Sequence, residues 1–199
     1  MARIDWSDYA CSGLYDELVS EGRVPREAAG ELCRYLASLT AEEVGELKTA
    51  AEVAIQVMGI TFTVYSDGNM IDRAWPFDIV PRIIPLSEWQ RVEAGLKQRV
   101  HALNLFIDDL YHDRRIIKDG VFPAELLEQS VNFRQQCVGI SPPRGIWAHI
   151  CGSDLVRDVD GTMYVLEDNL RVPSGVSYML ENRHVTKRVF PELFESYAP

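Results

Sequence analysis

Metal chemistry is favoured by three side chains that carry oxygen atoms, Asp154, Glu167 and Asn169, within the segment GSDLVRDVDGTMYVLEDNLRVPSG. The dipeptide Asp160-Gly161 between them predicts a two-residue type I′ turn, and its flanks mix β-branched and apolar residues with polar ones, as hairpin strands do. With that turn as the loop, Asp154 pairs directly with Glu167, and Asn169 lies two residues further along the same face.

The register of this predicted hairpin decides whether the three side chains meet. A four-residue loop at 158–161 would keep them on one face, whereas an odd-length loop or a bulge would separate them. On one face the two carboxylates repel each other unless a cation lies between them. Mg²⁺ suits such oxygens and shares them with substrate phosphates and water. The same pattern is also typical of an acidic hairpin that faces solvent and binds no ion.

Helices and a second hairpin are expected before this segment. Helices are predicted over 26–38 and from Thr40, where Thr40 and Glu43 form a capping box and Gly59 ends the second helix. A hairpin with a Ser-Asp-Gly-Asn turn is predicted over 60–75, because threonines alternate with apolar residues on its first strand.

The longest predicted helix runs from about Glu88 to His112, and its continuous apolar face predicts packing along most of its length. Three shorter elements are predicted after it: a helix over 123–129, a strand over 145–157 and a helical run from Pro191. The expected fold class is α+β, mainly an antiparallel sheet with packed helices. We expect a helical N-terminal segment at 1–58 and a metal-ligand portion at 59–199.

Five stretches of the sequence resemble one protein family. They are GITFTVYSDG, PFDIVPRIIPLSEW, QRVHALNLFIDDLY, HICGSDLVRD and LEDNLRVPSGVSYMLENR, which cover most of residues 59–183. In these stretches the chain resembles the circularly permuted ATP-grasp proteins of the second type, relatives of glutathionylspermidine synthase. In ATP-grasp ligases an Asp is followed, across a hairpin, by Glu-x-Asn and a Pro-Gly turn. Asp154, Glu167, Asn169, Pro173 and Gly175 occupy those places.

The resemblance implies a fold, a reaction and a metal. The fold is part of a permuted ATP-grasp, and the reaction joins a carboxylate to an amine through an acyl phosphate formed with ATP. Asp154, Glu167 and Asn169 would hold Mg²⁺ bridging the phosphates of ATP. Small molecules or peptides would supply the carboxylate and the amine.

Positive and hydrogen-bonding groups near the metal ligands are expected to hold the phosphoryl oxygens. Arg171 is the predicted catalytic residue, because it stays on the metal face if the strand continues. Arg157 falls on the opposite face, at an odd spacing from Asp154. For either arginine a surface ion pair is the alternative. Ser174 and Gly175 are predicted to bind the nucleotide through hydroxyl and backbone groups, with a plain turn as the alternative.

The chain also departs from the family pattern. Glutathionylspermidine synthase has a catalytic arginine two residues before the Asp, and this chain has Gly152 there. We expect the chain to be the N-terminal portion of such a ligase and inactive alone, with Mg²⁺ and ATP as cofactors and with ATP binding that needs the missing half. Two alternatives stay open: a non-catalytic module that binds a cation or a partner, and a subunit completed in trans by a nucleotide-binding half. No chemical role follows from the sequence for Arg82 or Arg183.

Composition narrows the classes of partner. Across 199 residues, 30 Asp and Glu outnumber 20 dispersed Lys and Arg, and the net charge of −10 argues against nucleic acid and anionic membranes. No apolar run reaches the length of a membrane span, and the N-terminus lacks the apolar core of a signal peptide, so the cytoplasm is expected. The four cysteines have no metal-site spacing and are expected to be free thiols.

Overall fold

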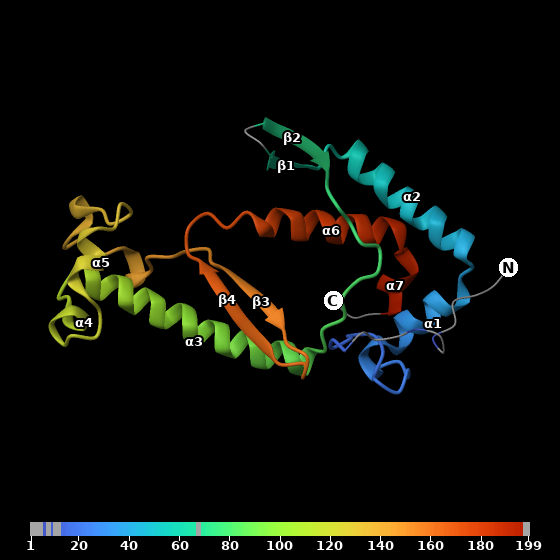
Figure 1. Cartoon of the computed structure of the whole chain (residues 1–199), viewed down its shortest axis with the longest axis horizontal. Helices are drawn as coiled ribbons and strands as arrows, with labels where there is room; N and C mark the ends of the chain where they lie inside the picture. Colours follow the sequence, from blue (N-terminus) through green and yellow to red (C-terminus); the bar gives the residue numbers. More distant parts are fainter. Residues whose placement is uncertain (1–5, 7–8, 10–12, 67–68, 197–199) are drawn as a thin grey trace. The chain divides into compact units, whose positions relative to one another are not determined.

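The computed structural model describes residues 6, 9, 13–66 and 69–196, with side chains for all of these except 62–66, 69–74 and 195–196. The chain divides into two compact units, whose helices and strands are drawn in Figure 1. Unit 1 comprises Met1–Pro85, Arg157–Thr162 and Ser174–Pro199. Unit 2 comprises Leu86–Val156 and Met163–Pro173. The predicted boundary between residues 58 and 59 stays a prediction.

Unit 1 is mainly helical. Its elements are η2 (Glu27–Ala29), α1 (Gly30–Ser38), α2 (Ala41–Val57), β1 (Thr61–Ser66), β2 (Asn69–Ala74), α6 (Gly175–Val189) and α7 (Pro191–Ser196). The predicted capping box is present, since the Thr40 side chain accepts from the Glu43 backbone and the Glu43 side chain accepts from the Thr40 backbone. The chain leaves α2 through Gly59, whose φ of +68° suits a residue without a side chain.

The hydrophobic core of unit 1 lies among its helices. Leu32 and Phe190 are among the most buried side chains, at 0% and 1% exposed. The core consists of residues from α1, α2, α6, α7 and the segment before α3: Leu32, Leu36, Ala51, Ile55, Ile79, Val185, Val189, Phe190 and Leu193. Burying apolar area on this scale is the main force that holds helices distant in sequence together.

The first hairpin is confirmed and is fastened to α6. Strands β1 and β2 pair antiparallel from Thr61 opposite Ala74 to Ser66 opposite Asn69, and the predicted turn residues between them lie outside the described residues. Just after β2, the Trp75 ring stacks on Tyr178 with centroids 4.0 Å apart. The Trp75 indole N–H donates to Asn182 Oδ1 at 2.9 Å. An aromatic stack and a hydrogen bond therefore both join the end of the first hairpin to α6.

Unit 2 is built on the longest helix. Its elements are α3 (Leu86–Tyr111), α4 (Arg115–Lys118), α5 (Ala124–Glu128), η3 (Gln135–Cys137), η4 (Pro143–Gly145), β3 (Gly152–Arg157, of which Arg157 counts in unit 1) and β4 (Met163–Asn169). The predicted long helix and the short helix near 123–129 are confirmed. Within α3 only Leu110 is fully buried, and the rest of the apolar face is half-buried or exposed.

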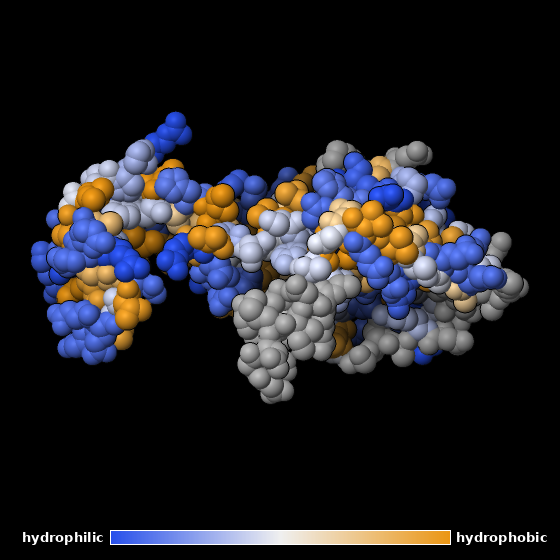
Figure 2. Space-filling view, turned by 90° about the horizontal axis from the view of Figure 1, so that it is seen from above, coloured by the Kyte–Doolittle hydropathy of each residue, from blue (hydrophilic) through white to orange (hydrophobic). Residues whose placement is uncertain are grey.

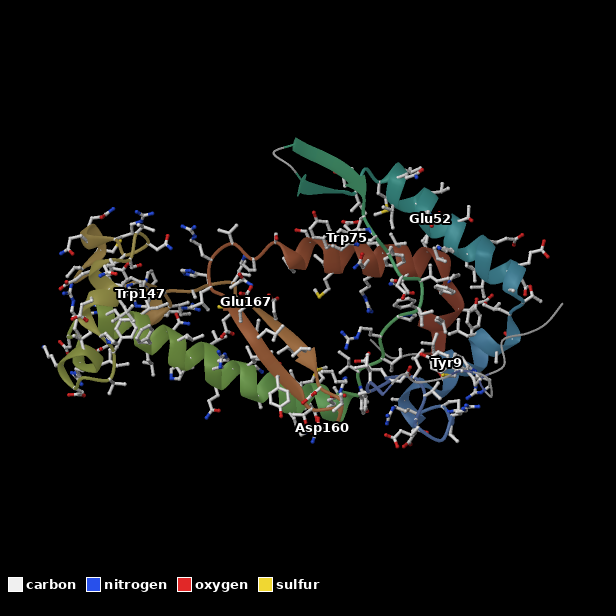
Figure 3. All side chains as sticks on the ribbon, viewed as in Figure 1. Tyr9, Glu52, Trp75, Trp147, Asp160 and Glu167 are labelled. Carbon is white, nitrogen blue, oxygen red and sulfur yellow. The ribbon has the colours of Figure 1, made fainter. Side chains whose placement is uncertain are left out.

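The C-terminal end of α3 organises the irregular segment that leads into β3. The Tyr111 ring lies between the rings of Phe133 and Trp147, with centroids 4.8 and 4.7 Å away. Asn104 Oδ1 accepts the backbone N–H of Trp147 at 2.8 Å, and Asp108 Oδ1 accepts its indole N–H at 2.9 Å. Figure 3 labels Trp147 in this region. Stacking and hydrogen bonds thus fix the chain where few apolar side chains are buried.

The α+β class and the antiparallel pairing are confirmed, with differences in extent. The strands of the described residues form two separate two-stranded hairpins, and helices make up most of the regular structure. The strand predicted over 145–157 is wrong in its first half, because the chain turns at Arg144 and Gly145, which have φ of +61° and +68°. The sequence does not predict helix α6. The free thiols are confirmed for Cys33, Cys137 and Cys151.

Apolar side chains also reach the surface, as the orange atoms in Figure 2 show. Leu166 and Val172, for example, are 69% and 85% exposed. Within the described ranges, no helix combines the length and the apolar character needed to cross a bilayer.

A charged cluster in unit 1 holds the tip of the second hairpin. The Glu17 carboxylate accepts from Arg157 Nε at 2.8 Å and from Arg82 Nε at 2.8 Å. Only 11% of the Glu17 side chain and 6% of the Arg157 side chain are exposed. The Arg157 guanidinium also lies 4.9 Å from the centroid of the Tyr15 ring. Burial alone would raise the pKa of Glu17, but the hydrogen bonds and charges of the two arginines outweigh it and lower this pKa.

This lowered pKa predicts an acid-sensitive contribution to stability. A carboxyl whose pKa is lower in the folded state stabilises the fold above its unfolded pKa, here near 4.5, and loses that contribution as the pH falls through the folded value. Melting temperatures of the native chain and Glu17→Gln should therefore differ at pH 6, by roughly 2–4 °C for each kcal/mol lost. The difference should shrink below pH 4.5. A difference that stays constant from pH 6 to pH 3 would contradict this assignment.

Candidate metal centre

The turn between β3 and β4 differs from the predicted one. The Gly161 N–H donates to the Asp158 carbonyl at 2.9 Å, and the Asp158 N–H donates to the Thr162 carbonyl at 2.9 Å. With φ of +88° at Gly161, these bonds define a three-residue loop, a type I turn followed by a G1 bulge. The predicted two-residue turn at Asp160-Gly161 is therefore wrong. Asp160 Oδ1 accepts the Thr162 N–H at 2.8 Å, an Asx contact that favours this turn.

An odd-length loop should move Asp154 and Glu167 to opposite faces, but a second irregularity restores them. The side chains of β3 alternate, with Asp154 and Val156 exposed. On β4 the alternation fails at one point, because Leu166 and Glu167 are consecutive and both exposed. One extra residue in β4 would produce such a slip and would offset the odd loop. The hydrogen bonds from Ser153 to Asp168 and from Asn169 to Asp154 agree with this arrangement of the faces.

The structure consequently brings the three predicted metal ligands together on the outward face. Asn169 Nδ2 donates to Glu167 Oε1 at 3.1 Å and to Asp154 Oδ2 at 3.3 Å. All three residues are exposed, and Figure 3 labels Glu167 on β4. The amide thus lies between two carboxylates that would otherwise repel each other, in the place where the sequence predicts a cation.

The oxygen atoms on this face could coordinate a magnesium ion that also binds substrate phosphates. Two carboxylates and one amide are too few for an all-protein cage, and the part of the chain that the structure describes has no group of three or more His, Cys, Asp or Glu placed to hold a metal. Mg²⁺ usually takes one or two carboxylates, with water and substrate phosphates completing its octahedron. A half-turn of the Asn169 amide would present Oδ1 in place of the N–H donors.

Asp168 points inward, between its two outward neighbours. Its side chain is 6% exposed and accepts from Arg99 Nε of α3 at 2.5 Å. Ser153 Oγ of β3 donates to its other oxygen at 2.7 Å. Burial would raise the pKa of Asp168, but the hydrogen bonds from Ser153 and Arg99 and the Arg99 charge outweigh it and lower this pKa. This cluster is not predicted from the sequence, although an acid on the inner side of a hairpin indicates a partner.

Arg171, Ser174 and Gly175 are not placed on the outward face by strand geometry. Strand β4 ends at Asn169, so the condition under which Arg171 would stay on the metal face is not met. Arg171 is exposed in a bend. Ser174 is the N-cap residue of α6, without a side-chain capping bond, and Gly175 is the first residue of that helix. These two belong to unit 1, and the roles predicted for all three residues stay predictions.

The structure gives contacts for the arginines without a predicted role. Arg157 is directed inward, as its spacing from Asp154 predicts, and it bonds Glu17 and the Gly161 carbonyl. Arg82 shares that carboxylate. The Arg183 guanidinium lies 5.1 Å from the centroid of the Phe194 ring. These contacts favour packing and ion-pair roles for the three residues.

Gly152 is required by close packing at the start of β3. A Cβ atom at this position would lie 2.8 Å from Pro173 Cβ and 3.8 Å from Asn169 Cβ. The proline therefore fills the space that a side chain at 152 would need. Any side chain at position 152, an arginine included, would therefore require Pro173 to move.

We expect Gly152→Ala to destabilise the chain by about 1–3 kcal/mol, because Pro173 must move to admit the methyl group. Gly95→Ala is the matched control, since a Cβ at this position of α3 meets no atom within 4 Å. The control should gain up to about 1 kcal/mol, as alanine favours helices over glycine. Urea unfolding of the two variants measures both effects, and equal midpoints would refute the packing argument.

Comparison with known proteins identifies the family. A family model described as circularly permuted ATP-grasp type 2 matches residues 81–199. The chain is 46% identical to an uncharacterized protein of Synechocystis sp. over 94% of this chain and 39% of the relative. It is 46% identical to one of Mycobacterium leprae, over 81% of this chain and 28% of the relative.

A third relative carries the name of an enzyme. A Frankia alni protein, named as a candidate glutamate–cysteine ligase 2-3, is 40% identical over 90% of this chain and 20% of its own length. The chain thus spans well under half the length of these relatives. Because the family model covers more than half of the chain, and its match includes both strands of the candidate metal centre, the chain belongs to the circularly permuted ATP-grasp type 2 family.

Proposed function

We propose that this chain is the magnesium-binding part of an ATP-dependent ligase that joins a carboxylate to an amine. The observation that carries the proposal is the outward face of the second hairpin, where Asp154, Glu167 and Asn169 meet in a chain of this family. The name of the Frankia alni relative supports the same reaction class, since a glutamate–cysteine ligase forms an amide from a carboxylate and an amine.

The surroundings of the three ligands suit a nucleotide better than a free ion. Val156, Tyr164 and Leu166 lie on the same outward face and are 41%, 51% and 69% exposed. A nucleotide combines a flat, weakly polar base with a polyanionic tail. Apolar and aromatic side chains favour the base, and a metal held by carboxylates favours the phosphates. One face of one hairpin therefore offers both kinds of contact.

Each polar residue has a place in the proposed reaction. Asp154 and Glu167 would hold Mg²⁺ with carboxylate oxygens, and Asn169 would hold it with Oδ1. When bound, the ion would supply positive charge opposite the phosphates of ATP. Arg171 stabilises negative charge on the transferring phosphoryl oxygens, and the amine then displaces phosphate from the acyl phosphate.

Nucleotide phosphates are further contacted, in the proposal, by Ser174 and Gly175. Gly175 opens α6, so its backbone N–H is among the groups that have no partner inside the helix, and the Ser174 hydroxyl is a second donor. A Cβ at Gly175 would meet no atom within 4 Å, so the fold itself leaves this position open.

The complete reaction is proposed for a longer assembly than this chain. Because the chain spans 39% or less of the relatives described above, the nucleotide-clasping part belongs either to the same polypeptide or to a partner in trans. The substrates are a small-molecule or peptide carboxylate and an amine. Those of glutathionylspermidine synthase are not carried over, because Gly152 replaces the arginine at that position.

Calorimetric titration of ATP into the chain tests the proposal. Any ATP binding by the chain alone should require Mg²⁺, and Glu167→Ala should weaken it at least tenfold, because the metal would lose one of its carboxylates. Glu52→Ala, which removes the same charge from exposed α2 (Figure 3), should bind like the native chain.

Two other results would redirect the proposal. Cation binding that is unaffected by ATP would favour a non-catalytic cation module. ATP binding that neither Mg²⁺ removal nor Glu167→Ala changes would contradict the assignment of the outward face.

A further inference from the structure

The slip in β4 leaves two possible orientations for the side chains at its C-terminal end, residues 167–169. Leu166 faces outward, and with regular alternation Glu167 and Asn169 would face inward while Asp168 faced outward. In the structure the reverse holds, because Glu167 is exposed directly after Leu166. A shift of one residue exchanges the two faces of a strand completely. It would therefore remove two of the three proposed ligands from the outward face.

Asp168 distinguishes the two arrangements. Facing inward, its carboxylate receives hydrogen bonds from Ser153 on β3 at 2.7 Å and from Arg99 on α3 at 2.5 Å, and its side chain is 6% exposed. Facing outward, it would lose both donors. Hydrogen bonds to a charged acceptor are the stronger ones in proteins, and an inward-facing carboxylate without them is costly to bury.

We propose that the Arg99–Asp168–Ser153 cluster is a register lock, which holds Asp168 inward and thereby sets Glu167 and Asn169 outward as metal ligands. Asp168 and Arg99 are positioning residues in this account, since they act on the metal through their neighbours. The inference rests on the proposed function, because it concerns the same metal. It adds that Arg99, a residue of α3 that does not face the ion, affects metal affinity.

Arg99 gives the sharpest test, because electrostatics and positioning predict opposite signs. Arg99→Ala removes a positive charge near the site, which by charge alone would leave cation binding unchanged or strengthen it. If Arg99 positions Asp168, the same substitution weakens cation binding, by about 10–100-fold as for other residues behind metal ligands. Lys97→Ala is the matched control. Lys97 is on the same helix, and its exposed partner is Glu93, 2.8 Å away.

The experiment measures Mn²⁺ binding to the whole chain, with free Mn²⁺ quantified by electron paramagnetic resonance. Mn²⁺ stands in for Mg²⁺, because both take octahedral oxygen ligands. The native chain, Arg99→Ala, Arg99→Lys, Asp168→Asn, Lys97→Ala and Glu167→Ala are compared at a temperature well below each melting point. We expect weaker binding for Arg99→Ala and Asp168→Asn, partial recovery for Arg99→Lys, and native affinity for Lys97→Ala.

The outcomes separate the lock from the site itself. If the native chain binds Mn²⁺ and Glu167→Ala does not, but Arg99→Ala binds as tightly as the native chain or more tightly, the lock is overturned and the metal site stands. If the native chain binds no Mn²⁺, or Glu167→Ala binds equally well, the metal site is overturned together with the lock. Loss of affinity in a folded Arg99→Ala, with native affinity in Lys97→Ala, supports the lock.

Discussion

The inward hydrogen bonding of Asp168 is the interaction on which the geometry of the candidate metal centre depends. A strand has only two faces, so an irregularity of one residue decides between two complete sets of side chains. The second hairpin contains two such irregularities, the three-residue loop closed at Gly161 and the slip at Leu166–Glu167. These two irregularities offset each other. The register lock, formed by Arg99 of α3, Asp168 of β4 and Ser153 of β3, holds the slip in β4 in place.

Helix α3 connects the register lock to the rest of unit 2. The C-terminal part of α3 holds the segment before β3. It does so through hydrogen bonds from Trp147 to Asn104 and Asp108, and through the stacking of Tyr111 between Phe133 and Trp147. Arg99, between the two ends, bonds β4. Because few apolar residues of unit 2 are fully buried, directional contacts carry much of the positioning. This suits a site whose ligands must hold a defined geometry.

How far the sequence predicts this structure depends on the range of the interactions. The capping box at Thr40 and Glu43 and the long helix α3 depend on residues close in sequence, and both are predicted correctly. The length of the turn at Gly161 is predicted wrongly, because an Asp-Gly pair fits both a two-residue and a three-residue loop. The choice between the two loops involves the Asp160 side chain. Helix α6 is not predicted, because the sequence around Ser174 and Gly175 is expected to bind the nucleotide or to form a plain turn, whereas in the structure α6 begins at Gly175.

The candidate site shows the same division. Family resemblance indicates Asp154, Glu167 and Asn169, and the structure brings them together on one face. The reason they meet is not local, since it involves Arg99, which lies 69 residues before Asp168. The close approach of Gly152 and Pro173 is likewise formed only when the hairpin has closed. Spacing along one strand identifies neither contact.

Anomalous diffraction from crystals of the chain soaked in Mn²⁺ would locate a bound ion without reference to affinity or activity. We expect an anomalous peak on the outward face of the second hairpin, about 2.0–2.2 Å from oxygens of Asp154 and Glu167. We also expect the Asn169 amide to turn its oxygen toward the peak. A hairpin open to solvent in the crystal without any peak, or an ion bound only elsewhere, would contradict the assignment of these three residues as metal ligands.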